Sequence, residues 1–363
     1  MRTERALNFN PGPAALPLPV LEQARDELLN FKGEGLSILE ISHRSRAFES
    51  LVLETEKLMK EIMQIPGGYR ALFLQGGASL QFSLIPMNFL PAGETADYIV
   101  TGSFAEKACK DAGQVGQVHL AANTKGQGHR RIPRQEELHF SPSPAYVHLT
   151  TNNTVYGTQW HYTPTTPGSP LVADMSSDIL SRPLDVSAYA FIYAGAQKNM
   201  GPAGVTAVII SEEMLDRVPQ SLPSMLRYDL HAKNNSLYNT PPSFGVYIMN
   251  LVLKWAAENG GLSRLEEVNR KKAALIYKVL DEYPDFYRGH AEKDSRSLMN
   301  VTFRLPSEEL EGLFIQEAGK WNMTGLKGHR SVGGIRASIY NAMPEKGCRT
   351  LADFMEDFYA RKG

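Results

Sequence analysis

The sequence predicts an α/β protein: a mostly parallel β-sheet covered by helices on both faces, followed by a smaller C-terminal α/β unit. Between residues 70 and 215, short apolar runs typical of buried strands alternate with longer segments of helical periodicity. Parallel strands need helical crossovers, so this alternation indicates a parallel sheet. The chain has 363 residues, which is enough for two domains.

The individual elements follow in order along the chain. Six runs rich in apolar residues are the expected strands of the large sheet: 69–75, 95–102, 145–152, 169–177, 188–195 and 205–211. Helical patterns over 77–90 and 103–115 separate the first three of them.

After residue 240 the pattern changes to a long helical stretch that is interrupted at the glycine pair Gly260 and Gly261. The smaller unit has expected strands at 297–306 and 334–341 and expected helices at 308–321 and 351–362. We therefore expect a large domain over residues 17–256 and a small domain over residues 257–363, which the N-terminal arm, residues 1–16, joins.

Composition limits the possible partners and compartment. Lys and Arg number 38 and Asp and Glu number 39, so the net charge of −1 does not indicate a nucleic-acid or membrane-surface partner. The N-terminus lacks the apolar core of a signal peptide, and no run is long enough to span a membrane. The two cysteines, Cys109 and Cys348, have no metal-ligand spacing. We expect a cytoplasmic protein with reduced thiols and no metal.

Lys198 is the first candidate for a catalytic residue. It lies in "YAGAQKNMGPAG", between two strand-like apolar runs, so its loop is expected at the end of a buried sheet. An amine that is partly desolvated there loses its proton easily, as a lysine that forms a Schiff base must. The alternative is an ordinary surface-loop lysine.

Asp174 is the second candidate, at the end of the apolar run "SPLVAD" and 24 residues before Lys198. Residues at the carboxyl ends of neighbouring parallel strands face one crevice, so the two side chains are expected to meet. An Asp beside a pyridinium nitrogen keeps that nitrogen protonated, which makes pyridoxal phosphate an electron sink. A helix N-cap or turn residue is the alternative interpretation of Asp174.

The stretch "LFLQGGASLQF" combines an expected strand, a glycine pair, Ala78, Ser79 and an expected helix. Glycines allow a phosphate to approach the backbone, and the N-terminus of a helix offers free N–H groups. The stretch matches neither GxxxxGK[ST] nor GxGxxG, so a nucleotide is not indicated. A simple tight turn explains the glycines equally well.

Basic residues occur in pairs near both ends of the chain. "ISHRSRAF" contains His43 and Arg44, and "LKGHRSVGGIRASIYN" contains His329, Arg330 and Arg336. Arg binds carboxylate and phosphate groups through two hydrogen bonds, so two His–Arg pairs suit a small dianion. Ordinary solvated surface charge is the alternative.

A phosphate turn, an Asp and a Lys in this chain order resemble the fold-type I enzymes that use pyridoxal phosphate. Within that group the chain resembles the phosphoserine aminotransferase family of the class V aminotransferases, from about residue 7 to the C-terminus. Six stretches carry the resemblance: "NFNPGPAALP", "SHRS", "LQGGASLQF", "ADMSSDILSRPLDVSAYAFIYAGAQKNMGPAG", "NTPPSF" and "GHRSVGGIRASIYNAM". It implies that the large sheet has seven strands.

The resemblance also implies how the cofactor is bound. Lys198 would form the internal aldimine with pyridoxal 5'-phosphate, and Asp174 would pair with the ring nitrogen. Other expected cofactor contacts are Ala78, Ser79, Phe104, Thr154, Gln197, Asn239 and Thr240. Phe104 departs from the family pattern, in which the residue stacked on the ring is often Trp; Phe still offers a π face, without the indole N–H.

In this family the residues at Asn239 and Thr240 reach the cofactor phosphate of the partner subunit, so the resemblance implies a homodimer with active sites completed across the interface. His43, Arg44, His329 and Arg330 would hold the substrate phosphate or carboxylate, and Arg336 the α-carboxylate. The implied reaction is the reversible transamination of 3-phosphohydroxypyruvate with L-glutamate, giving O-phospho-L-serine and 2-oxoglutarate in L-serine biosynthesis. A second role on 4-phosphohydroxythreonine in pyridoxine biosynthesis stays open.

Three rival functions remain to be weighed. A cysteine desulfurase needs a mobile, low-pKa cysteine, and neither Cys109 nor Cys348 lies in a suitable segment. Serine–glyoxylate transamination does not need four donors suited to phosphate. A non-catalytic protein that binds pyridoxal phosphate or a phosphorylated metabolite would leave Lys198 and Asp174 without a chemical use.

Overall fold

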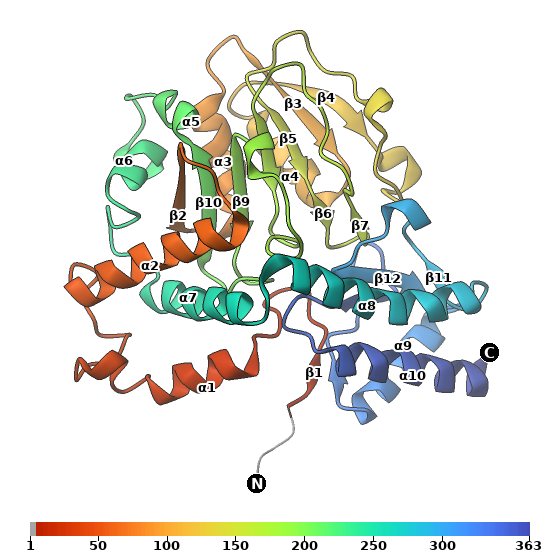
Figure 1. Ribbon diagram of the computed structural model, residues 1–363. Coiled ribbons are helices and arrows are strands. Elements are labelled where there is room, and N and C mark those ends of the chain that lie inside the picture. The colour runs from red at the N-terminus through yellow and green to blue at the C-terminus, as the bar shows by residue number, and fades with distance from the viewer. Residues whose placement is uncertain (1–4) are drawn as a thin grey trace.

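A seven-stranded sheet forms the centre of the computed structural model, which describes residues 5–363 (Figure 1). Its strands lie in the order β2-β10-β9-β8-β5-β3-β4. Their bounds are β2 Tyr69–Gln75, β3 Thr95–Val100, β4 Gln117–Asn123, β5 Val147–Thr150, β8 Leu171–Asp174, β9 Phe191–Gly195 and β10 Val205–Ser211. The expected α/β class and the mostly parallel seven-stranded sheet are confirmed.

Five adjacent strands, from β9 to β4, run parallel, and only β10 is antiparallel to both of its neighbours. The segment that joins β9 to β10 is the short loop 196–204, which has no room for a helical crossover. This loop carries Lys198. The sharp return of the chain therefore places the lysine at the carboxyl edge of the parallel strands.

Helices cover both faces of the large sheet (Figure 1). One core contains residues of α1, α2 and α7, and the other contains residues of α3, α4 and α6. Neighbouring residues of β2, Leu72 and Phe73, belong to opposite cores, as the alternation of side chains along a strand requires. The helix bounds are α1 Leu18–Asp26, α2 Arg46–Met63, α3 Gly77–Phe89, α4 Ser103–Ala112, α5 Glu212–Asp216, α6 Tyr228–Lys233 and α7 Ser243–Glu258.

A second, antiparallel sheet has the order β11-β12-β14 and its own core. Its strands and helices are β11 Arg288–Gly289, β12 Asn300–Arg304, β14 Ile335–Ser338, α8 Gly261–Glu282, α9 Glu308–Lys320 and α10 Glu345–Lys362. Helix α10 begins six residues before the expected helix. The N-terminal strand β1, Leu7–Asn8, pairs with β13, Met323–Thr324, and Phe9 enters the same core.

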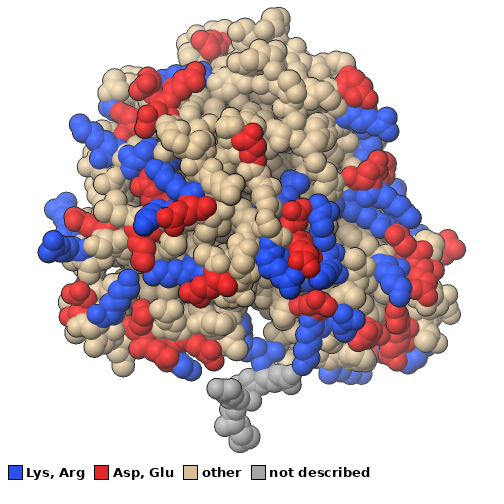
Figure 2. All heavy atoms as spheres, in the orientation of Figure 1, with Lys and Arg blue, Asp and Glu red and all other residues tan. Residues whose placement is uncertain are grey.

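Helix α8 connects the two halves of the molecule. Leu262 and Leu265 at its start pack into the core under the large sheet, whereas Ala273 and Ile276 pack into the core of the small sheet. Positive and negative side chains are interspersed on the surface face in Figure 2, as the net charge of −1 suggests. No helix within residues 5–363 is long and apolar enough to cross a membrane.

Candidate active site

Lys198 lies three residues after the end of β9, and its ammonium group points at two other predicted residues. Its Nζ donates a hydrogen bond of 2.8 Å to Oγ1 of Thr154 and lies 5.1 Å from the centre of the Phe104 ring. Phe104 belongs to the first turn of α4, and Thr154 follows the short strand β6, Asn152–Asn153. Three segments that are far apart in the sequence therefore meet at one amine.

Asp174 is the last residue of β8, beside β9, and is almost completely buried. Its Oδ1 accepts hydrogen bonds from the backbone N (2.9 Å) and Oγ (2.6 Å) of Ser176. Oδ2 accepts none from the residues that the structure describes. Burial raises the pKa of Asp174, and the positive charge of Lys198 opposes this shift. The turn interpretation is confirmed, because Oδ1 stabilises the turn, and Oδ2 has no hydrogen bond from the described residues.

Ser176 also ties the ends of β8 and β9 together. Its Oγ accepts a hydrogen bond of 3.0 Å from the backbone N of Gly195 while it donates to Asp174. The sequence analysis gave this serine no role. The contacts of Ser176 with both Asp174 and Gly195 can be predicted only when β8 and β9 are known to be neighbours.

The glycine pair and the first residues of α3 present backbone N–H groups that have no partner within the helix. Gly76 adopts φ +96°, and a Cβ at this position would collide with the side chain of Leu80. Ala78 and Ser79 lie in the first turn of the helix, where backbone N–H groups have no partner within the helix. The predicted arrangement of strand, turn and helix N-terminus is present at the edge of the sheet.

The N-terminal segment passes directly over the lysine loop. A Cβ at Gly12 would lie 3.3 Å from Cγ of Lys198 and 3.4 Å from Cγ of Gln197, and its φ of +140° favours glycine. Ala14 N donates to Gln197 O (2.9 Å), and the hydroxyl of Tyr340 donates to Pro11 O (2.7 Å). Neither Gly12 nor Tyr340 was assigned a role from the sequence, although both stand in stretches that carry the resemblance.

Arg336, on β14, is buried and has no carboxylate partner among the described residues. It is 6% exposed, its Nε has no hydrogen-bond partner, and its guanidinium forms no ion pair within residues 5–363. Burial lowers the pKa of Arg336. An uncompensated buried guanidinium is costly, so this position calls for an anionic ligand.

His329 and Arg330 lie near Arg336. Burial lowers the pKa of His329, and the charges of Arg336, Arg330 and Lys107 lower it further. The Nδ1 of His329 is held by Oγ of Ser331 at 2.6 Å. Arg330 is exposed and forms no ion pair with the residues described. The expected basic residues at this end of the chain therefore lie together, and Arg336 is close enough to Lys198 for its charge to lower the pKa of that lysine.

The other basic pair contacts a different set of predicted residues. Nδ1 of His43 lies 3.2 Å from Oγ1 of Thr240, and Nε2 of His43 is buried without a partner. Arg44 is exposed, and the Nδ2 of Asn239 donates to the backbone O of Thr240 (3.2 Å). No hydrogen bond or ion pair within the described chain links this group to Lys198.

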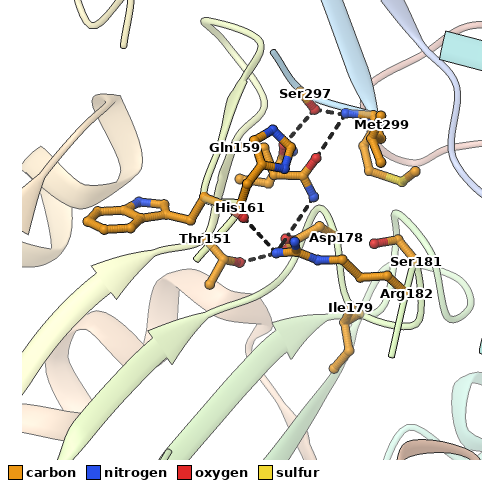
Figure 3. Close-up of polar contacts among 12 residues, drawn as sticks. Thr151, Gln159, His161, Asp178, Ile179, Ser181, Arg182, Ser297 and Met299 are labelled. Atoms are coloured by element: carbon orange, nitrogen blue, oxygen red, sulfur yellow. Dashed lines mark hydrogen bonds and ion pairs between the residues drawn. The ribbon is translucent and has the colours of Figure 1, made fainter. Parts of the chain in front are cut away.

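A second buried carboxylate, Asp178, takes part in a network of polar contacts (Figure 3). Its oxygens accept hydrogen bonds from Oγ1 of Thr151 and from Nε2 of Gln159 (3.1 Å). The backbone N of Thr151 donates to the backbone O of Asp174, at 3.0 Å. Oε1 of Gln159 accepts from the backbone N of Leu298, which precedes β12 of the small sheet. This network, which the sequence analysis missed, couples the end of β8 to the small sheet.

Comparison with known proteins agrees with this geometry. The model of the aminotransferase class-V family matches residues 6–351. Phosphoserine aminotransferase of Herpetosiphon aurantiacus is 58% identical over 98% of this chain and 99% of that protein, and the one of Geobacillus kaustophilus is 54% identical over 99% of each. The chain belongs to the phosphoserine aminotransferase family.

Solved structures give the same result. The phosphoserine aminotransferase of Bacillus circulans subsp. alkalophilus superposes with a TM-score of 0.97 at 52% identity, covering 99% of this chain and 100% of that one. The PLP-bound enzyme of Trichomonas vaginalis has a TM-score of 0.92 at 35% identity over 97% of this chain and all of that one. This chain is thus a pyridoxal-phosphate-dependent aminotransferase of class V.

The residues in place fit this cofactor. The site offers a half-buried amine at Lys198, a carboxylate oxygen of Asp174 without a protein donor, an aromatic face at Phe104 and free N–H groups at the start of α3. These groups match, in the same order, the aldehyde, the pyridine nitrogen, the ring face and the phosphate of the cofactor. No group of three or more His, Cys, Asp or Glu side chains within residues 5–363 could hold a metal ion.

The cysteines do not have the properties that a desulfurase requires. Burial raises the pKa of Cys109, and it raises the pKa of Cys348 to about 12. Both thiols are free, and Cys348 is buried in α10. A thiol with a raised pKa is a poor nucleophile at neutral pH.

The charge state of Lys198 gives a test that needs no substrate. Burial lowers the pKa of its amine to about 8; Asp174 opposes the shift, and Arg336 adds to it. Only the neutral amine is nucleophilic, so acylation of Lys198 in the cofactor-free protein should increase with pH with a midpoint of about 8. Peptide-resolved mass spectrometry measures this rate. A midpoint at ~10, close to the reference value for lysine, would contradict the assigned environment.

Proposed function

We propose that this enzyme transfers the amino group of L-glutamate to 3-phosphohydroxypyruvate, giving 2-oxoglutarate and O-phospho-L-serine in L-serine biosynthesis. The observation that carries the proposal is a group of donors without carboxylate partners among the described residues: the guanidinium groups of Arg336 and Arg330 and the imidazole of His329, with Arg336 near Lys198. A substrate with both a carboxylate and a phosphate supplies the negative charge that these side chains lack. The function named for the Herpetosiphon and Geobacillus relatives supports the same assignment.

The bound cofactor supplies an electron sink for the negative charge that develops at Cα when the substrate loses its proton. We propose that Lys198 binds the cofactor covalently through Nζ. Once released by the incoming amine, the same Nζ takes the proton from Cα. A pKa of about 8 suits this base, because a larger fraction of the amine is neutral near neutral pH than in an ordinary lysine. The hydroxyl of Thr154, 2.8 Å from Nζ, orients it and is positioned to contact the ring hydroxyl.

Asp174 holds a proton on the pyridine nitrogen through its free Oδ2, while Ser176 fixes Oδ1. Phe104 stacks on the ring. The backbone of Ala78 and Ser79 and the side chain of Gln197 bind the cofactor phosphate, helped by the positive end of α3. Arg336 binds the α-carboxylate of either substrate, and this fixes which face of Cα meets the lysine.

The remaining predicted residues support a homodimer. His43, Arg44, Asn239 and Thr240 form one cluster, and the family resemblance puts Asn239 and Thr240 at the partner's cofactor phosphate. His43 would then reach the partner's site together with Thr240. Leu29, Leu36 and Leu39 in the segment before His43 are 85%, 50% and 65% exposed, an apolar surface that a second subunit would cover. We also propose a division into residues 17–256 and residues 257–363 with the arm 1–16, and a cytoplasmic location.

The proposal is tested by steady-state kinetics with glutamate as the donor. The purified holoenzyme should use 3-phosphohydroxypyruvate with a much higher kcat/KM than hydroxypyruvate, which differs only in the phosphate. Coupled detection of 2-oxoglutarate measures both rates. Equal kcat/KM for the two acceptors would overturn the assigned substrate, while the assignment to class V would stand.

Replacing Arg330 or His329 with alanine should weaken the phosphorylated acceptor selectively. Each side chain offers a charge-assisted hydrogen bond to phosphate, so its loss should lower kcat/KM for 3-phosphohydroxypyruvate by roughly tenfold or more. The same variants should change kcat/KM for hydroxypyruvate much less. Equal losses on both acceptors would mean that these residues do not bind the phosphate.

A further inference from the structure

Lys107 lies on the same side of α4 as the ring of Phe104. The two residues are three positions apart in the helix, so their side chains are neighbours on one face. The Nζ of Lys107 is 5.3 Å from the centre of the Phe104 ring, and the Nζ of Lys198 is 5.1 Å from the same centre. Phe104 therefore contacts both the lysine of the active site and a second, exposed lysine.

The ammonium group of Lys107 has no carboxylate partner within residues 5–363. The adjacent carboxylate, Glu106, already contacts Lys125 at 3.1 Å and His129 at 3.2 Å. Lys254, by contrast, pairs with Glu54 at 2.8 Å. A lone cation at the edge of an active site is available to an anionic ligand.

Lys107 and two arginines near the small sheet all act on one imidazole, that of His329. Burial and the charges of Arg336 and Arg330 lower the pKa of His329, and the charge of Lys107 lowers it further. Lys107 and the loop with His329 and Arg330 thus approach one another from opposite halves of the molecule. Positive charges brought together in this way repel one another unless an anion lies between them.

We propose that Lys107 is a further substrate-binding residue, whose ammonium group binds the substrate phosphate from α4 opposite His329 and Arg330. This inference rests on the proposed function, because it requires a phosphorylated acceptor. Lys107 would add a cation to the phosphate site, and this cation comes from a helix that covers the large sheet, next to the ring of Phe104. The phosphate would then connect the two halves of the site.

Lys107→Gln tests the proposal in the holoenzyme, because it removes the charge and keeps most of the length of the side chain. Loss of an exposed charged contact should lower kcat/KM for 3-phosphohydroxypyruvate by roughly fivefold. The value for hydroxypyruvate should change by less than about twofold. Lys107→Arg keeps the charge and should restore most of the loss. Lys110→Gln is the matched control: an exposed lysine of the same helix, one turn farther from Phe104.

The outcomes separate the possible roles. A selective loss that Arg restores and Lys110→Gln does not reproduce supports the proposal. Equal losses on both acceptors would mean that Lys107 only supports Phe104, and no loss would mean that it does not contact substrate; either result overturns the proposal. A wild-type enzyme without preference for the phosphorylated acceptor would overturn the proposed function itself, and this inference with it.

Discussion

Replacing Lys198 with alanine is expected to lower turnover by at least about three orders of magnitude, because the variant loses both the covalent link to the cofactor and the base at Cα. The side chain is half-buried and donates one hydrogen bond, to Thr154, so its removal should leave the fold intact. Single-turnover absorbance with glutamate measures the loss, and thermal unfolding measures stability. The variant should still bind the cofactor without a covalent bond.

Lys125→Ala is the matched control for this experiment. Lys125 also follows the carboxyl end of a parallel strand, β4, but its Nζ is paired with Glu106 at 3.1 Å. Its removal should cost little turnover. If Lys198→Ala kept turnover close to that of Lys125→Ala, the assignment of the base would be wrong.

The architecture was largely predictable, because its central strands are apolar on both faces. Runs such as 205–211 are fully buried and read as strands without further information. Strand β4 was missed, since it lies at the edge of the sheet and Gln117, Leu120 and Asn123 face solvent. Only Ala121 of this strand is fully buried, so the strand lacks the continuous apolar run that marks the central strands.

The proximity of the proposed catalytic pair was predictable for a geometric reason. Asp174 and Lys198 follow neighbouring parallel strands, and the carboxyl ends of such strands share one edge. The residues that support the pair were not predictable, because their contacts depend on how distant segments pack. Gly12 crosses the lysine loop from the far end of the chain, and Tyr340 reaches Pro11 from the small sheet.

Lys272 illustrates the same limit. In the sequence it belongs to "NRKKAAL", which resembles the solvated face of a helix. In the structure it is fully buried, and its Nζ donates to the backbone O of Ile339, Tyr340 and Met343, at 3.0, 2.8 and 3.1 Å. It thereby stabilises the turn that carries Tyr340. Only the packing of α8 against this turn distinguishes it from the exposed Lys271 beside it.

Asp174→Asn is expected to lower turnover by about 10²- to 10³-fold, the cost of removing one preorganised charge from an active site. Asn can keep its oxygen toward Ser176, at the 2.9 and 2.6 Å contacts of the wild type, so the turn should persist. What disappears is the negative charge that keeps the pyridine nitrogen protonated. Pre-steady-state kinetics of the glutamate half-reaction should show the loss in the proton-transfer step, with little change in glutamate binding.

Stability of the cofactor-free protein supplies the independent measurement. Burial raises the pKa of Asp174 above its ordinary 3.8, so the folded state holds this proton more tightly than the unfolded state. The contribution of Asp174 to stability therefore falls as pH rises from about 3.8 through the folded pKa, and Asn should remove that fall. At neutral pH, cofactor-free Asp174→Asn should be at least as stable as the wild type. The control, Asp178→Asn, should be less stable than the wild type, because it changes a carboxylate that accepts hydrogen bonds from Thr151 and Gln159. If Asp174→Asn instead destabilised the cofactor-free protein at neutral pH, the carboxylate would have a protein partner there, and its free oxygen would not be reserved for the cofactor.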